Sequence, residues 1–142
     1  MLIVVEEFPD QNGGAAIQKV VDSLGDDAAI VAVTLGRWQV LSTLVSSPVG
    51  NDFYGSKVLA QLEASGISFD RKINRRVTTP LEVGIVDSTG SRTYFQQRDP
   101  RELESIPVPS DSQMTEASML YVDWYDGPRM LDAMERAQAH GV

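Results

Sequence analysis

The residues of this chain that could do chemistry are carboxylates at the predicted ends of helices and strands. Asp26 and Asp27 precede a predicted helix, and Asp123 follows the apolar run at 119–122. In open α/β sheets ligands bind beyond the carboxyl ends of the strands, and a carboxylate oxygen accepts hydrogen bonds from ligand hydroxyls. The pattern therefore predicts a site for a polyhydroxylated ligand. The other acidic and amide residues at element ends are Asn51, Asp52 and Asp126.

The same carboxylates also have a purely structural interpretation. Aspartate is a preferred N-cap residue, so Asp26 and Asp27 could serve only to begin a helix. Asp123 differs, because an acid at the end of an apolar strand is a poor structural choice unless it faces a cavity. Both interpretations stay open, and they predict different behaviour: a cap affects stability, whereas a ligand contact affects affinity.

Several classes of active site are excluded by the residues that are absent. The 142 residues contain no cysteine, which excludes disulfides, thiolate metal sites and thiol nucleophiles. The one histidine, His140, lies at the end of a predicted helix and is interpreted as a C-terminal cation. Walker-type and dinucleotide glycine loops, His-Glu-x-x-His and Gly-x-Ser-x-Gly are all missing.

The charge of the chain argues against two kinds of partner. A net charge of −8 disfavours non-specific binding to nucleic acids and anionic membranes. The compact basic run at 71–76 has no interleaved aromatic residue and is interpreted as a solvated strand or turn. The apolar start at 1–5 is too short for a membrane span and is followed by two glutamates, so we expect a cytoplasmic protein.

Hydrophobic periodicity predicts an α/β order with a strand-rich insertion. Helices are expected from Asp26 or Asp27 to 38, from Asn51 or Asp52 to 65 with Gly66 as the left-handed stop, and from Pro128 to 140. Strands are expected at 2–5, 39–49, 67–75, 80–88, 92–98 and 119–124, with a hairpin at 88–91. Segment 15–23 is ambiguous, because its apolar spacing favours a helix while its glycines and β-branched residues suit a strand.

Four stretches of the sequence resemble motifs of the ribokinase-like (PfkB) carbohydrate kinase family. In that family a strand leads to Val-Gly-x-Asp-x-Phe-Gly and then to a helix, and here the stretch reads "VGNDFYG" at 49–55. "GDDAAIVAVTLGRW" at 25–38 is similar to the sugar-binding helix start, and "MLYVDWYD" to the strand that delivers a sugar-binding acid. "TTPLEVGIVDSTGSRTYF" at 78–95 is most similar to the ketohexokinase-like branch.

The resemblance implies a ribokinase-like three-layer αβα sandwich with a small β-sheet lid. Residues 1–142 would form a partial domain, with lid strands around 2–23 and 68–98. The family's first strand and its C-terminal half would be absent. Because family members have lid strands here, we predict a strand for 15–23 against its helical periodicity.

The resemblance also assigns candidate site residues. Gly25, Asp26 and Asp27 stand where the family contacts sugar hydroxyls, and Asp123 where an acid often binds the sugar. Arg92 stands where ketohexokinase-like members place an arginine near the active site, although a solvated hairpin arginine fits it equally well. Two positions depart from the family: Asp26 replaces a glycine, and Ile30 replaces an asparagine.

The activity implied by the resemblance is transfer of the γ-phosphoryl group of ATP, with Mg²⁺, to a sugar hydroxyl. The catalytic Gly-Ala-Gly-Asp loop would lie in the absent half, so we expect no catalytic residue, no metal ligand and no activity in this chain alone. A nucleoside kinase of the same fold and a non-catalytic sugar-sensing relative are the alternatives. The expected partners are a small-molecule sugar and, through pairing of lid edge strands, a second copy of the chain.

Overall fold

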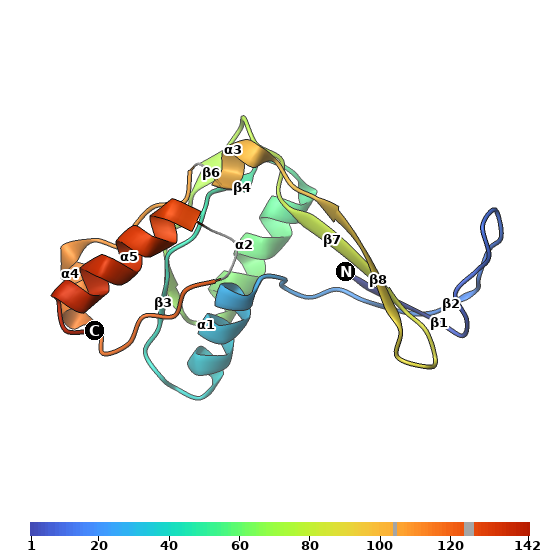
Figure 1. The fold of residues 1–142 in the computed structure, drawn as a ribbon, viewed down its shortest axis with the longest axis horizontal. Coiled ribbons are helices and arrows are strands. Elements are labelled where there is room, and N and C mark those ends of the chain that lie inside the picture. The colour runs from blue at the N-terminus through green and yellow to red at the C-terminus, as the bar shows by residue number, and fades with distance from the viewer. Residues whose placement is uncertain (104, 124–126) are drawn as a thin grey trace.

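The computed structural model describes residues 1–103, 105–123 and 127–142. Figure 1 shows two parts, a four-stranded sheet that extends away from the molecule and a body of helices and short strands. We call the four-stranded sheet the outer sheet. Asp126 and Trp124, which the sequence analysis placed at the end of a strand, lie outside the described residues.

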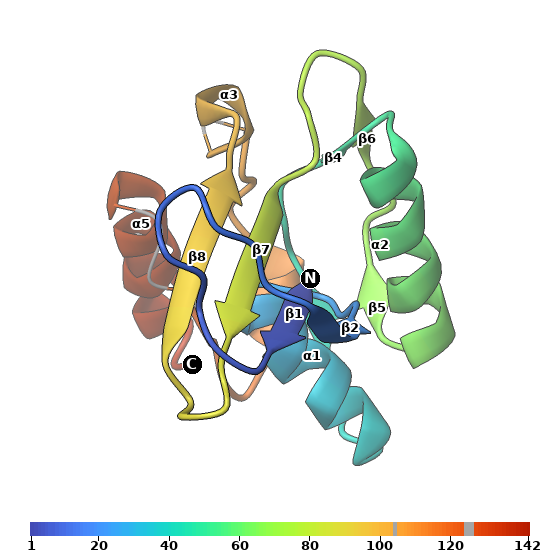
Figure 2. The same ribbon diagram turned by 90° about the vertical axis from the view of Figure 1, so that its right-hand side faces the viewer.

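The outer sheet combines strands from two regions of the sequence in the order β2-β1-β7-β8 (Figure 2). β1 pairs antiparallel with β2 and parallel with β7, and β7 forms an antiparallel hairpin with β8. Segment 15–23 therefore contains a strand, as predicted. Its helical periodicity is overridden because strand pairing to β1 satisfies its backbone. The bounds are β1 Leu2–Val5, β2 Ile17–Val21, β7 Leu81–Val86 and β8 Arg92–Gln97.

The body has helices on both sides of short parallel strands. In Figure 1 the path of β3 and β4 runs between α1 and α2 on one side and α4 and α5 on the other. β3 pairs parallel with β5, and β4 pairs parallel with β6. The bounds are α1 Asp27–Arg37, β3 Thr43–Leu44, β4 Val49–Gly50, α2 Phe53–Ser65, β5 Ser68–Phe69, β6 Ile73–Asn74, α3 Pro100–Leu103, α4 Asp111–Glu116 and α5 Gly127–Ala139. No helix of the described residues is long and apolar enough to cross a membrane.

The predicted helices begin and end where their capping residues stand. The Asp26 side chain accepts a hydrogen bond from Asp27 N–H at the start of α1. Asp52 caps α2 by accepting from Gly55 N–H at 2.8 Å, and Gly66 ends that helix with φ 72°. Between the two helices the core is formed by Ala32, Leu44, Leu62 and Ile67.

Three predicted strands are wrong in extent. The strand expected at 39–49 is reduced to β3 and β4, and the one expected at 67–75 is divided into β5 and β6. Residues 119–123 form no strand. Their apolar pattern suits a strand, but a strand needs a neighbour for its backbone hydrogen bonds, and none of the described residues pairs with this segment.

Candidate functional site

Two carboxyl groups from distant parts of the sequence meet at the N-terminus of α1. The side chains of Asp26 and Asp123 hydrogen-bond each other. Asp123 Oδ2 also accepts from the backbone N–H of Ala28 at 3.1 Å, and Asp26 Oδ1 accepts from Asp27 N–H at 3.1 Å. The free N–H groups and the dipole of a helix N-terminus favour negative charge at this position.

The pKa of the Asp26 carboxyl is raised from its ordinary value of 3.8 to about 7. The largest cause is loss of hydration, followed by the hydrogen bond and the negative charge of Asp123. The charge of Arg98 and the N–H of Asp27 oppose the rise. Two carboxyls this close cannot both ionise without a penalty, so the pair holds one proton below neutral pH.

The backbone of Asp26 adopts a conformation that favours glycine. Its φ is 77° and its ψ is 131°. A side chain in this region adds on the order of 1–3 kcal/mol of strain, which persists only where surrounding contacts hold it. The resemblance noted in the sequence leads us to expect glycine at this position, and the observed φ of Asp26 is one that glycine adopts without strain.

Tyr121 and Arg98 belong to this cluster although the sequence analysis did not select them. The pKa of Tyr121 is raised by loss of hydration and then by the charges of Asp27, Asp123 and Asp26. Tyr121 lies two residues before Asp123 in the same apolar run, and this closeness in the sequence could have identified it. The sequence held no such signal for Arg98, since its position depends on how β8 leaves the outer sheet.

The predicted site residues are brought together only in part. Asp26 and Asp123 are in contact, and the charge of Asp27, like theirs, raises the pKa of Tyr121. Gly25 directly precedes Asp26 in the chain. Arg92 lies at the opposite end of β8 from Arg98, where it pairs with Val86 beside the hairpin turn. Six strand residues span about 20 Å, so Arg92 is not brought to the carboxylates. Its exposed position fits the solvated-hairpin interpretation.

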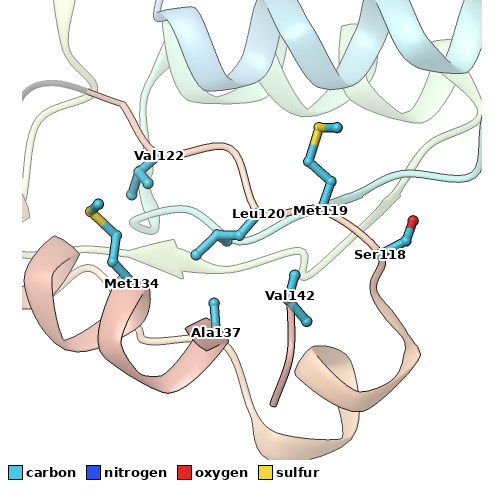
Figure 3. A pocket seen from close by; sticks show the side chains of 7 residues that line it. All are labelled: Ser118, Met119, Leu120, Val122, Met134, Ala137 and Val142. Carbon is cyan, nitrogen blue, oxygen red and sulfur yellow. The ribbon is translucent and has the colours of Figure 1, made fainter. Parts of the chain in front are cut away.

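The segment that leads to Asp123 also lines an apolar pocket, together with residues of α5. Figure 3 shows Leu120 and Val122 of this segment facing Met134 and Ala137 of α5 across the pocket. The volume is about 260 Å³, and Ser118 is the lining residue with a polar side chain. This lining suits apolar packing rather than recognition of hydroxyls. The lining residues are Ser118, Met119, Leu120, Val122, Met134, Ala137 and Val142.

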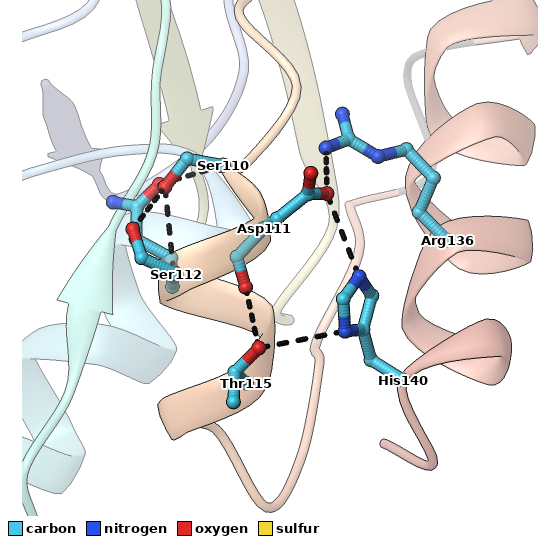
Figure 4. A network of polar contacts seen from close by, with 7 residues as sticks. Ser110, Asp111, Ser112, Thr115, Arg136 and His140 are labelled. Carbon is cyan, nitrogen blue, oxygen red and sulfur yellow. Dashed lines mark hydrogen bonds and ion pairs between the residues drawn. The ribbon is translucent and has the colours of Figure 1, made fainter.

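His140 takes part in a polar network that joins α4 to α5 (Figure 4). Asp111 Oδ1 accepts from Arg136 at 2.5 Å and lies 3.5 Å from His140 Nε2. The hydrogen bond from Arg136 is the largest cause that lowers the pKa of Asp111. These contacts give His140 a structural position at the end of α5, away from the Asp26–Asp123 pair.

Comparison with solved structures identifies the fold. The chain superimposes on a ribokinase from Giardia lamblia with a TM-score of 0.68 and 17% identity, covering 98% of this chain and 44% of that one. A fructokinase with bound ATP from Xylella fastidiosa gives a TM-score of 0.66 and 20% identity, covering 98% and 45%. The chain therefore has the ribokinase-like α/β fold, as predicted.

A sequence relative supports the same superfamily. The chain is 33% identical over 113 residues to a nucleoside kinase of Methanothermobacter thermautotrophicus. The aligned region covers 78% of this chain and 36% of the relative. No protein-family model matches the chain. The chain thus spans about a third of the curated relative it matches. The assignment to the ketohexokinase-like branch stays a prediction.

Proposed function

We propose that this chain is the substrate-binding portion of an ATP-dependent kinase that phosphorylates a hydroxyl of a sugar, either free or within a nucleoside. The observation that carries the proposal is the meeting of Asp26 and Asp123 at the N-terminus of α1. Two adjacent carboxyls offer several acceptor lone pairs within a few ångströms, which matches the neighbouring hydroxyls of a sugar ring. The kinases of the same fold support the phosphotransferase class.

The substrate contacts follow from the ionisation of the pair. Above neutral pH both carboxyls are charged, and ligand hydroxyls that donate to them replace the hydrogen bond lost with the shared proton. A hydrogen bond to a charged group contributes roughly 1.5–3 kcal/mol. We assign Asp26, Asp27 and Asp123 to hydroxyl binding, with Gly25 providing close backbone approach. Arg92 is left out of this assignment because of its place on β8.

A nucleoside is favoured as the second candidate by a specific observation. Ile30 lies one turn along α1 from Asp26 and its side chain is 48% exposed, while Tyr121 is 49% exposed. An aliphatic and an aromatic surface beside hydroxyl acceptors suit a base attached to a ribose. The 33% identity to a nucleoside kinase agrees with this candidate.

ATP and Mg²⁺ are proposed for the whole protein and are not assigned to residues of this chain. Among the described residues no group of three or more His, Cys, Asp or Glu side chains could hold a metal ion. The sequence contains no Gly-Ala-Gly-Asp loop, and more than half of each matched kinase lies outside the region covered. We therefore propose that the catalytic base belongs to that remaining portion. As the resemblance implies, we also propose that the outer sheet acts as a lid or as a dimer surface. A cytoplasmic location is proposed for the protein as well.

Isothermal titration calorimetry of the 142-residue chain tests the binding site. At pH 8 we expect saturable binding of ribose, fructose or adenosine, weakened about 10- to 100-fold by Asp123→Asn because a charged acceptor is lost. Asp132→Asn, an exposed acid on α5, is the matched control and should bind as the unaltered chain does. Tighter binding of adenosine than of ribose selects the nucleoside. Absence of saturable binding, or equal affinity in the two variants, would refute the site.

A further inference from the structure

The loop that joins β1 to β2 lies at the end of the outer sheet that is far from the helices (Figure 1). It comprises residues 6–16, and residues 9–16 are all exposed. The loop contains a short turn, in which Gly13 N–H donates to the carbonyl oxygen of Asp10 at 2.8 Å. Exposed loop tips are the parts of a folded chain that reagents from solvent reach most easily.

This turn suits an asparagine followed by a glycine. Asn12 has a φ of 66°, a left-handed conformation that asparagine tolerates better than most other residues. A Cβ at position 13 would lie 3.0 Å from the carbonyl oxygen of Asp10 and 3.6 Å from Cβ of Pro9, so the close approach favours glycine there. At Gly14, by contrast, an added Cβ would meet no atom of the described residues within 4 Å.

The same pair places a nucleophile beside an electrophile. A bond between the main-chain nitrogen of Gly13 and the side-chain Cγ of Asn12 would close a five-membered ring. A side chain on the residue after the asparagine would hinder this approach, and glycine has none. Among the described residues none hydrogen-bonds to the Asn12 side chain, so its amide is free to turn toward the Gly13 nitrogen.

The other two asparagines of the sequence lack these features. Asn51 is followed by Asp52, and Asn74 is followed by Arg75. The Asn74 side chain is also fixed, because its Oδ1 accepts from Arg76 N–H at 2.9 Å. Both asparagines therefore serve as internal references within the same chain.

We propose that Asn12 is a site of spontaneous covalent modification, at which the folded chain converts this asparagine to aspartate and isoaspartate. The Gly13 nitrogen gives its proton to hydroxide and adds its electron pair to Cγ of Asn12. The bond from Cγ to the side-chain nitrogen then breaks, and ammonia leaves with a proton from water.

Water then opens the cyclic imide at one of its two carbonyl carbons. Attack at Cγ restores the normal main chain and leaves an aspartate. Attack at the main-chain carbonyl carbon leaves the chain running through Cβ and Cγ, which is isoaspartate. The net reaction converts one amide and one water into a carboxylate and an ammonium ion.

The hydrogen bond from Gly13 N–H to Asp10 slows this reaction without preventing it. While the bond is formed, the proton on the nitrogen is held, so the turn must open before attack. This opening is local, because the bond lies within the loop and the pairing of β1 with β2 is kept. We therefore expect the folded chain to react more slowly than the unfolded chain, but without global unfolding.

The products change the loop in two ways. Both place a new carboxylate in a loop that already carries Glu6, Glu7 and Asp10. Isoaspartate also lengthens the main chain by one carbon, so we expect the hydrogen bond between Gly13 and Asp10 to be lost. Neither change involves the carboxyl pair of the proposed binding site, so the modification does not depend on the proposed kinase function.

Peptide mapping of the full chain by mass spectrometry tests the proposal. Lys19 is the first basic residue, so trypsin releases residues 1–19 with Asn12 as their one asparagine. The chain is incubated at pH 8.5, circular dichroism confirms that it stays folded, and a parallel sample in urea gives the rate for the unfolded chain. In the folded chain we expect peptide 1–19 to change from amide to acid several-fold faster than the peptides that contain Asn51 or Asn74. Part of the product should accept methyl groups from an isoaspartate methyltransferase.

Two alanine variants form a matched pair. Gly13→Ala places a methyl group beside the attacking nitrogen and should slow the conversion several-fold, whereas Gly14→Ala should convert as the unaltered chain does. Asn12→Gly keeps a residue suited to the left-handed turn and should show no conversion. The proposal is overturned if peptide 1–19 stays unconverted in the folded chain, if the product contains no isoaspartate, or if the two alanine variants convert at the same rate.

Discussion

Replacing Asp26 by glycine should stabilise the chain, and more so at pH 8 than at pH 5. At pH 5 the carboxyl is protonated in the folded state, so Asp26→Gly changes the backbone and removes an uncharged side chain, while Asp123 keeps the N–H of Ala28 as a donor. Relief of the strained φ of 77° contributes about 1–2 kcal/mol. Loss of the cap costs a few tenths of a kcal/mol and the added freedom of glycine in the unfolded chain costs about 0.4–1 kcal/mol. The net gain expected at pH 5 is therefore about 0–1 kcal/mol.

Ionisation of Asp26 adds a second contribution at higher pH. Because the folded pKa of about 7 lies above the ordinary value of 3.8, the folded state holds its proton longer than the unfolded state does. The free energy of unfolding therefore falls as pH rises from about 4 to 7 and is level above that. A fully buried carboxyl would lose about 4 kcal/mol over this range, but Asp26 is partly exposed and we expect about 1–2 kcal/mol. Asp26→Gly removes this loss.

Urea denaturation followed by circular dichroism at pH 5 and pH 8 measures both contributions. The expected gain is about 0–1 kcal/mol at pH 5 and about 1–3 kcal/mol at pH 8, while Asp132→Asn should show no such difference. A gain that is equal at the two pH values would show that Asp26 is not held protonated by Asp123. Destabilisation by more than about 1 kcal/mol at both would refute the assignment of strain as well.

Two further predictions concern the contacts that hold the body together. Thr79→Val should lower the free energy of unfolding by about 1–3 kcal/mol, because Gly50 N–H loses its buried acceptor, whereas Thr93→Val at an exposed position of β8 should change it little. Leu62→Ala should cost about 2–5 kcal/mol since Leu62 is 4% exposed in the core, while Leu131→Ala, at 60% exposed, should cost far less. Equal losses in either matched pair, measured by urea denaturation, would contradict the packing described.

The elements that the sequence predicted well are those with local signals. Asp52 and Gly66 mark both ends of α2, because an N-cap acceptor and a left-handed glycine act on their own neighbours in the chain. The hairpin between β7 and β8 was likewise expected from its turn residues. Strand lengths were predicted poorly. Whether residues 119–123 form a strand depends on a neighbouring strand, which no local pattern specifies.

The candidate site was predicted to the extent that it follows from strand and helix ends. Asp26 and Asp123 were expected to meet because one begins a helix and the other ends an apolar segment, and they do. Arg98 was missed, since its approach to Asp26 is decided by the direction in which β8 leaves the outer sheet. Arg92 was selected from a motif alone, and a motif does not say at which end of the strand the ligand lies.

The departure at Asp26 connects the strain, the proton and the proposed binding site. A glycine at this position would keep the backbone conformation without strain and without a second carboxyl beside Asp123. The aspartate instead adds strain and a charge that is costly near neutral pH. Both costs fall at the point where the connection from the outer sheet enters the body. Residues that lower the stability of the folded chain are expected at functional sites, where function requires them. Asp26 is such a residue at a predicted ligand site. The same carboxyl would regain its stabilising partners when ligand hydroxyls donate to it, which is why the gain in stability from Asp26→Gly should be accompanied by weaker sugar or nucleoside binding at pH 8.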